Sequence, residues 1–222
     1  APVARRLFVI GLLLLLMLPT VEAQRKKVGV VLSGGGAKGV AHIGVLKVLE
    51  KAGIPVDVIV GTSMGSIVGG LYAIGYSADQ LDSLVRVQDW MFLLSDKVNR
   101  YDLPFGEKEQ DGKYLLSVPF DRGKKRPSGF ISGQNVYNLF SDLTIGYHDS
   151  LDFLQLPIPF ACVAADMFHR EEIVMKGGNL VQAMRASMAI PGVFTPVRTG
   201  DRVLVDGGIL NNFPTDVARE LG

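Results

Sequence analysis

The chain has few of the side chains that covalent cross-links and metal clusters require. Of its 222 residues only one is a cysteine, Cys162, and only three are histidines. A single cysteine excludes an intramolecular disulfide and a cysteine-based zinc cluster. Cys162 lies in the apolar stretch 158–165, which predicts a buried thiol. We therefore expect a fold that is stable without disulfides, and no metal site.

An excess of charge of one sign is also missing. The 23 lysine and arginine residues nearly balance the 22 aspartate and glutamate residues, which leaves a formal net charge of +1. This balance gives no general electrostatic attraction to nucleic acid. The apolar fraction of 48% excludes a disordered chain, and the length suits one domain with a sizeable core.

No apolar run reaches the roughly 20 residues that a transmembrane helix needs. The longest, Leu7–Leu18, follows Arg5 and Arg6, ends at Pro19 and precedes the small-residue site around Ala23. This pattern predicts a secretory signal peptide over residues 1–23, with export to the periplasm, the outer membrane or the medium. A short uncleaved anchor is the alternative.

The remaining pattern alternates between short β-branched runs and amphipathic segments, which predicts an α/β fold with a largely parallel sheet. Residues 90–133 break the pattern with prolines, glycines and mixed charges, and predict a lid. The domain spans 24–222, and we expect the native chain to continue, since such a sheet ordinarily gains another strand. The expected strands are 27–32, 56–60, 158–164, 171–175 and 202–206, and the expected helices are 40–52, 66–74, 77–87, 134–143, 180–186 and 214–221.

The pentapeptide 61–65 has the pattern G-x-S-x-G, with Ser63 at its centre. Gly61 and Gly65 allow a sharp turn from strand to helix that raises the serine hydroxyl into the open. The pattern alone is weak. Here the apolar segment 58–60 precedes it and a small-residue helix follows, so Ser63 is a candidate nucleophile.

A glycine-rich loop, 34–39, follows the first strand and has two interpretations. As G-x-G-x-x-G it matches a dinucleotide fingerprint, which needs an acidic residue at the end of the second strand. The nearest acid, Asp57, stands at the start of that strand. The other interpretation is an oxyanion hole, because bare amides at a helix N-terminus stabilise negative charge. We favour this second interpretation.

Asp206 is the best candidate for the base that a nucleophilic serine needs. It ends a strand, and Gly207 and Gly208 keep the approach open. Burial would raise its pKa and strengthen it as a base. His42 has the character of a helix-face residue, and His148 and His169 have no motif around them.

Together these three motifs resemble those of the patatin-like phospholipase family. The stretch 186–194 also looks like the family, and the resemblance spans about residues 28–222. It implies a three-layer α/β fold with helices on both faces of the sheet. It also implies that Ser63 is the nucleophile, Asp206 the base and the loop the oxyanion hole. The loop residues concerned are Gly34, Gly35, Gly36, Lys38 and Gly39.

The resemblance implies a lipid acyl hydrolase of the phospholipase A, lysophospholipase or esterase type, with no cofactor. Its partners would be lipid or phospholipid esters and, peripherally, a membrane; its oligomeric state stays open. The signal peptide makes the chain similar to exported bacterial members, some of which continue into a membrane barrel. Alternatives are a thioesterase or general carboxylesterase, a non-catalytic lipid-binding or passenger module, and a nucleotide-binding oxidoreductase.

Overall fold

The computed structural model describes residues 25–98 and 129–222. The predicted signal peptide, 1–23, lies outside these residues, as does most of the predicted lid. Within the lid, the short helix α5 (Trp90–Leu93) and the strand β3 (Gly129–Ile131) are described.

A six-stranded sheet forms the centre of the fold, with the strand order β1-β2-β5-β10-β9 and with β6 paired to β5. Two small two-stranded sheets, β3-β8 and β4-β7, lie beside it. The strands are β1 (Gly29–Leu32), β2 (Val58–Thr62), β4 (Leu151–Asp152), β5 (Phe160–Asp166), β6 (Glu171–Met175), β7 (Gly177–Gly178), β8 (Gly192–Phe194), β9 (Val197–Thr199) and β10 (Arg202–Asp206).

The central sheet is mixed. β1, β2 and β5 run parallel, as the sequence predicts for the first strands. β10 runs antiparallel to β5 and to β9, so β9 points the same way as the parallel strands. β6 returns antiparallel along β5, which confirms the expected strand pair. Most strands therefore share one direction, and β6 and β10 are the exceptions.

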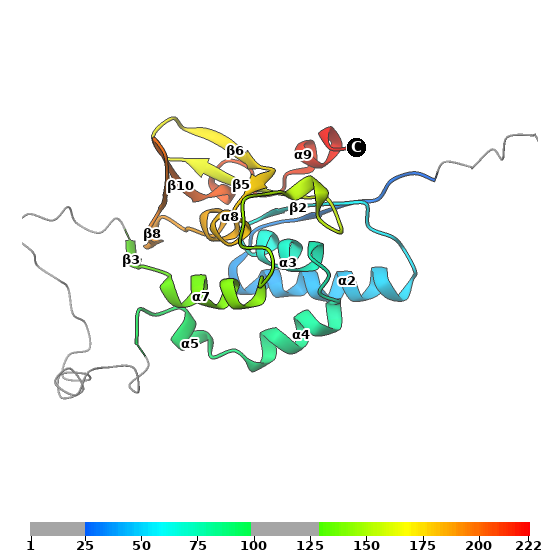
Figure 1. Cartoon of the computed structure of the whole chain (residues 1–222), viewed down its shortest axis with the longest axis horizontal. Helices are drawn as coiled ribbons and strands as arrows, with labels where there is room; N and C mark the ends of the chain where they lie inside the picture. Colours follow the sequence, from blue (N-terminus) through cyan, green and yellow to red (C-terminus); the bar gives the residue numbers. More distant parts are fainter. Residues whose placement is uncertain (1–24, 99–128) are drawn as a thin grey trace, which may run out of the picture.

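Helices α2, α3 and α8 cover one face of the sheet, with α4, α5 and α7 outside them, while α9 lies on the opposite face (Figure 1). The expected α/β architecture with helices on both faces is thus confirmed. The helices are α2 (Ala41–Lys51), α3 (Met64–Ala73), α4 (Ala78–Val87), α7 (Gln134–Leu143), α8 (Leu180–Ser187) and α9 (Thr215–Glu220), with 3-10 turns η1 (Gly36–Val40), η2 (Phe153–Gln155) and η3 (Gly207–Ile209).

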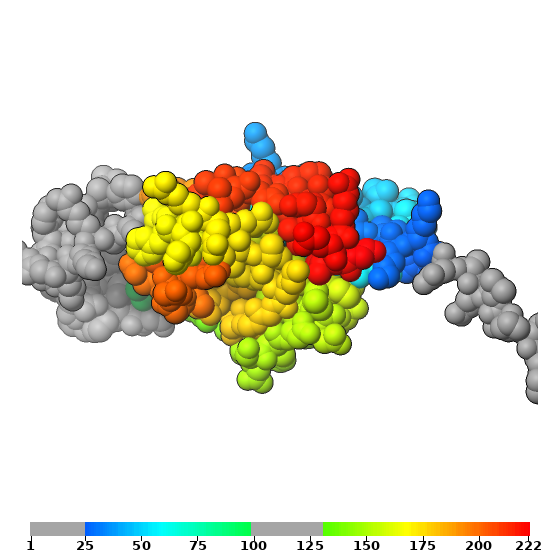
Figure 2. All heavy atoms as spheres, turned by 90° about the horizontal axis from the view of Figure 1, so that it is seen from above, coloured from blue at the N-terminus to red at the C-terminus, as the bar shows by residue number. Residues whose placement is uncertain are grey.

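Side chains that alternate along the strands divide the core into two layers. On β2, Ile59 faces the larger helical layer, whereas Val58 and Val60 face α9. On β5, Cys162 faces the helical layer and is fully buried, as predicted. Figure 2 shows the α9 side, where the C-terminal segment in red lies next to the hairpin that contains β6. Both faces of β2 are buried, which fixes the strand that leads to Ser63.

Most predicted element boundaries agree with the structure to within a few residues. Ser77 caps α4 through a reciprocal capping box with Gln80, as its position predicts. β2 extends to Thr62, two residues beyond the expected end. The strand therefore leads directly into Ser63, with no loop between them.

Candidate functional site

Ser63 stands at the junction of β2 and α3 in a backbone conformation that side chains rarely adopt. Its φ is 54° and its ψ is −121°, a region that costs of order 1–3 kcal/mol and persists only where packing enforces it. The side chain is almost fully buried, at 6% exposure. This is the sharp strand-to-helix turn that the G-x-S-x-G pattern predicts.

Two glycines make the turn possible. A Cβ at Gly61 would overlap the backbone of Gly65, and a Cβ at Gly65 would overlap the carbonyl of Leu32 in β1. Ser66 adds a clamp, because its hydroxyl and its amide both donate to the Ser63 carbonyl, at 2.6 and 2.9 Å. The enforced turn therefore depends on close backbone contact between β1, β2 and α3.

Asp206 accepts a hydrogen bond from the Ser63 hydroxyl, with 2.6 Å between Oγ and Oδ2. Its other oxygen, Oδ1, accepts from the Gly208 amide at 2.7 Å. Gly207 has no room for a side chain, since a Cβ there would overlap the Val163 carbonyl. The two residues that the sequence singles out, 143 positions apart, thus share a buried hydrogen bond.

The reason for this meeting differs from the one expected. A parallel sheet gathers the ends of its strands at one edge, but β10 is antiparallel to β5, so this rule does not place Asp206. Instead the register does. Asp206 pairs with Ala164 of β5, and Thr62 pairs with the preceding residue, Val163. Because β6 occupies the other edge of β5, β2 and β10 meet end to end along one edge, which places Ser63 next to Asp206.

Burial raises the pKa of the Asp206 carboxyl above its ordinary value, against the opposing effect of the hydrogen bonds from Ser63 and Gly208. Asp206 is 6% exposed. A desolvated carboxylate with a raised pKa is a stronger base than a carboxylate in water. The arrangement can therefore accept the proton of the serine hydroxyl to which it is bonded.

The glycine loop lies against the serine turn. A Cβ at Gly34 would come within 3.0 Å of the Ser63 Cβ, and one at Gly39 within 2.6 Å of the Met64 Cβ. Gly36 has a left-handed φ of 55° and shares a cavity with Ser63. The loop and the serine turn are thus neighbours, as two consecutive strand-helix units predict.

The amides of Gly34, Gly35 and Gly36 in the predicted oxyanion hole are not equivalent. The Gly34 amide donates to the Asn212 carbonyl at 3.3 Å, so it is already occupied. Within the described part of the chain, the Gly35 and Gly36 amides donate to no acceptor. Lys38 is exposed in η1, and its amide donates to the Gly35 carbonyl. Gly35 and Gly36 therefore remain as candidate donors.

Ser187, at the end of α8, is a site residue that the sequence did not single out. Its fully buried hydroxyl accepts from the Ser63 amide at 2.9 Å and donates to the Val163 carbonyl at 2.6 Å. This chain of bonds ties the serine turn to β5. In the sequence, Ser187 is part of the stretch 186–194, which resembles the family. Its role could not be predicted, because a hydrogen bond to a backbone amide far away in the sequence produces no local sequence pattern.

The histidines do not contact the serine hydroxyl. A ring nitrogen of His42 lies 2.8 Å from the Ser33 carbonyl, so this side chain supports the start of the glycine loop. His148 contacts the Ser141 carbonyl, and His169 contacts Asp166. Asp57, bonded to Arg25 and to the Val28 amide, stands at the opposite end of β2 from the loop.

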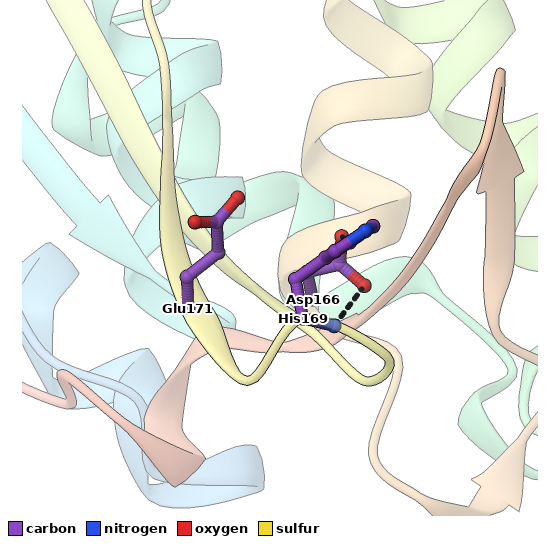
Figure 3. A group of neighbouring side chains, drawn as sticks. All are labelled: Asp166, His169 and Glu171. Carbon is purple, nitrogen blue, oxygen red and sulfur yellow. Dashed lines mark hydrogen bonds and ion pairs between the residues drawn. The ribbon is translucent and has the colours of Figure 1, made fainter.

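Asp166, His169 and Glu171 gather at the turn between β5 and β6 (Figure 3). Asp166 accepts from the His169 ring at 2.6 Å and from the Phe168 amide at 2.9 Å. Burial opposes ionisation of Asp166, but these bonds lower its pKa to about 2, and Asp166 in turn raises the pKa of His169. Glu171 pairs with Arg202 at 3.2 Å. These contacts stabilise the β5–β6 hairpin, and this structural role accounts for the cluster.

A cavity of about 400 Å³ opens beside Ser63 and is lined almost wholly by apolar side chains. They come from α3, α4, α5, α7 and the segment 188–194. A volume of this size falls in the range of small-molecule sites. Representative lining residues are Ile67, Leu71, Leu81, Leu139, Phe140 and Met188.

Comparisons with known proteins identify the family. The family model for patatin-like phospholipases matches residues 30–219. The chain is 32% identical over 192 residues to an uncharacterized NTE family protein of Mycobacterium tuberculosis, covering 86% of this chain and 28% of that protein. It is 34% identical over 197 residues to patatin-like phospholipase domain-containing protein 6 of Mus musculus, covering 88% and 13%.

The chain therefore spans less than a third of the length of these curated relatives. Among solved structures, VipD from Legionella pneumophila aligns with a TM-score of 0.55 at 17% identity, covering 86% of this chain and 47% of VipD. That similarity concerns the fold alone. The family match covers most of the sequence, including the serine turn, the glycine loop and Asp206, and on this evidence the chain belongs to the patatin-like phospholipase family.

Proposed function

We propose that this chain is a serine lipid acyl hydrolase that cleaves carboxylic esters through a dyad of Ser63 and Asp206. The observation that carries the proposal is the 2.6 Å hydrogen bond between Ser63 Oγ and Asp206 Oδ2, with Ser63 lining an apolar cavity. A nucleophile bonded to a base is the signature of an activated serine. The cavity is suited to the acyl chain of a lipid, and the family relatives support a phospholipid or lysophospholipid as substrate.

In the proposed mechanism, Asp206 accepts the Ser63 proton while Oγ attacks the ester carbonyl. The tetrahedral oxyanion accepts hydrogen bonds from the Gly35 and Gly36 amides. The alcohol or lysolipid leaves with the proton held by Asp206, and an acyl-enzyme remains. The proton passes from Asp206 to the leaving alcohol, Asp206 then takes a proton from the water that attacks the acyl-enzyme, and it returns that proton to Ser63 Oγ as the fatty acid leaves. The chain's own residues thus supply each proton transfer.

Thioesters and short carboxylic esters are the alternative substrates, since the same residues would attack them. The apolar lining of the cavity, whose volume is about 400 Å³, favours lipid esters over these. A non-catalytic lipid-binding module is disfavoured, because binding alone needs neither the strained backbone of Ser63 nor the bond to Asp206. A nucleotide site is disfavoured by the position of Asp57 at the far end of β2.

The first prediction concerns the base. Asp206→Asn keeps the volume but removes the proton acceptor, so kcat on a soluble chromogenic ester should fall roughly 100- to 10,000-fold. His148→Ala and His169→Ala should keep nearly full activity, and His42→Ala should lose only part because it supports the loop. Asp206 must be ionised to act as a base, and its pKa is raised above the ordinary 3.8. In the wild type, kcat/KM should therefore fall as the pH drops through this raised pKa.

A folded histidine variant as inactive as Ser63→Ala would replace the dyad with a triad. Melting temperatures identify the variants that fold.

The second prediction concerns the glycine loop. Gly35 is extended, with φ 174°, and the protein atom nearest to an added Cβ is 3.6 Å away, so Gly35→Ala should fold. The methyl group would stand beside the amides, where the oxyanion develops. kcat should therefore fall far more than KM rises, by up to roughly 100- to 1000-fold. Gly44→Ala on α2, where the space is open, is the matched control and should be nearly silent.

Steady-state kinetics on the same ester measure both variants. Near-normal kcat in folded Gly35→Ala would remove this glycine from the proposed oxyanion hole.

We further propose that the edge around Ser63 contacts a lipid surface. Trp90, Leu94, Ile190 and Val193 both line the apolar cavity and are solvent-exposed, so they form its mouth. Phe168, at the β5–β6 turn, is 66% exposed at the same sheet edge that β2 and Ser63 reach. In the described residues no helix has the length and apolarity to span a bilayer.

Phe213 adds to this edge. It is 58% exposed and follows Asn212, whose amide group contacts the Gly34 carbonyl. Apolar side chains at the mouth of an acyl cavity mark an interaction site. A lipid surface is the partner that fits, because the proposed substrate enters the cavity from it.

The third prediction uses Trp90, the sole tryptophan, as a probe. On phosphatidylcholine vesicles, the fluorescence of Ser63→Ala protein should shift to the blue and be quenched by brominated acyl chains. Phe168→Ser combined with Phe213→Ser should weaken vesicle binding while hydrolysis of a soluble ester in the Ser63 background stays normal. Val45→Ser combined with Val48→Ser, exposed on α2, is the matched control and should bind normally.

Soluble-ester turnover without any change in Trp90 fluorescence on vesicles would contradict the membrane surface and leave the hydrolase proposal standing.

A further inference from the structure

A second cavity, of about 360 Å³, lies away from the serine and has a different character. Polar side chains dominate its lining, among them Ser132, Gln134, Tyr137, Asn179 and Gln182. The cavity also contains Arg185 of α8. Nothing in the proposed hydrolase mechanism uses these residues.

Arg185 is a buried cation, with 5% exposure. Its Nη2 donates to the carbonyls of Ser132 and Thr195, at 2.7 and 3.0 Å, and its Cζ lies 5.0 Å from the centre of the Phe194 ring. Its Nη1 is buried and has no hydrogen-bond partner. Within the described residues, Arg185 forms no ion pair.

The N-terminus of α7 faces the same cavity through Gly133 and Gln134. Gly133 has a left-handed φ of 74°, and a Cβ there would lie 2.7 Å from Nε and Nη2 of Arg185. The glycine thus lets the guanidinium lie directly against the helix end. The Ser132 hydroxyl accepts from the Gln134 amide at 3.2 Å, and the first turn contains no acidic residue, so the remaining partial positive charge of this helix end adds to that of Arg185.

A buried cation beside a positive helix end is unfavourable unless an anion compensates it. Asp96 provides part of the compensation, because it accepts from the amide and hydroxyl of Ser132 and acts on Arg185 from there. It does not bond the guanidinium. The cavity between these groups is large enough for a small ligand, and its amide and hydroxyl side chains can donate further hydrogen bonds.

We propose that this cavity binds a phosphoryl group, held by Arg185, the N-terminus of α7 and the polar side chains around them. A guanidinium matches the oxygens of a phosphate, and helix N-termini bind phosphates through the same charge. The group can come from a soluble phosphate ester or from a lipid headgroup. The site shares a wall with the acyl cavity, because Phe194 and the pair β3-β8 separate the two.

The fourth prediction tests this site on the full chain with inorganic phosphate as the probe. Wild-type protein should bind phosphate saturably in a calorimetric titration at constant ionic strength. Gln182→Glu puts a negative charge on the cavity wall and should weaken the dissociation constant roughly tenfold or more, since like charges repel. Position 182 is the third residue of α8, where an acidic side chain favours the helix, so the variant should fold.

Gln80→Glu is the matched control, because it makes the same change at the third residue of α4, in an exposed capping box. It should bind phosphate like the wild type. Phosphatidylcholine vesicles with and without phosphatidate, beside glycerol phosphate in solution, then distinguish a lipid headgroup from a soluble ester. Either source supports the site. The site is contradicted if wild-type protein does not bind phosphate saturably, or if Gln182→Glu binds it as well as Gln80→Glu does.

Discussion

The packing of β1, β2 and α3 around Ser63 is the constraint on which the rest of the site depends. Gly65 touches the Leu32 carbonyl and Gly61 touches Gly65, so the turn has no room to relax. Its cost, of order 1–3 kcal/mol, is offset by the burial of β2 on both faces, by the hydrogen bond that the Ser66 hydroxyl donates to the Ser63 carbonyl and by the one that the Ser187 hydroxyl accepts from the Ser63 amide. Core packing thus maintains the strained backbone conformation of Ser63, in which the hydroxyl points at Asp206.

The register of β10 against β5 is the second constraint on the site, because it positions Asp206. Because β10 runs antiparallel to β5, its C-terminal end meets the C-terminal end of β2 and brings Asp206 next to Ser63, and η3 then turns the Gly208 amide onto the second carboxylate oxygen. Burial raises the pKa of this carboxyl, while the hydrogen bonds from Ser63 and Gly208 oppose that rise. The apolar cavity and the glycine loop both adjoin Ser63 at this edge of the sheet.

The sequence predicted the parallel start of the sheet, the main helices and the residues that the structure brings together at Ser63. It did so because each motif is local, with a glycine where a close approach demands one. What it could not predict depends on contacts distant in sequence. Ser187 reaches Ser63 across 124 positions, the Gly34 amide is taken by Asn212, and β10 is antiparallel because of its pairing. The short strands β3 and β8 also have no periodic signal. The predicted signal peptide stays a prediction.

Covalent labelling tests the central claim most directly. A fluorophosphonate forms a phosphorus–oxygen bond with an activated serine and releases fluoride. Intact-mass analysis and peptide mapping should find one adduct per chain, on Ser63. Ser63→Ala should remain unlabelled, and Asp206→Asn should label much more slowly while it stays folded. An adduct on another serine, or labelling of Asp206→Asn at the wild-type rate, would contradict a nucleophile activated by Asp206.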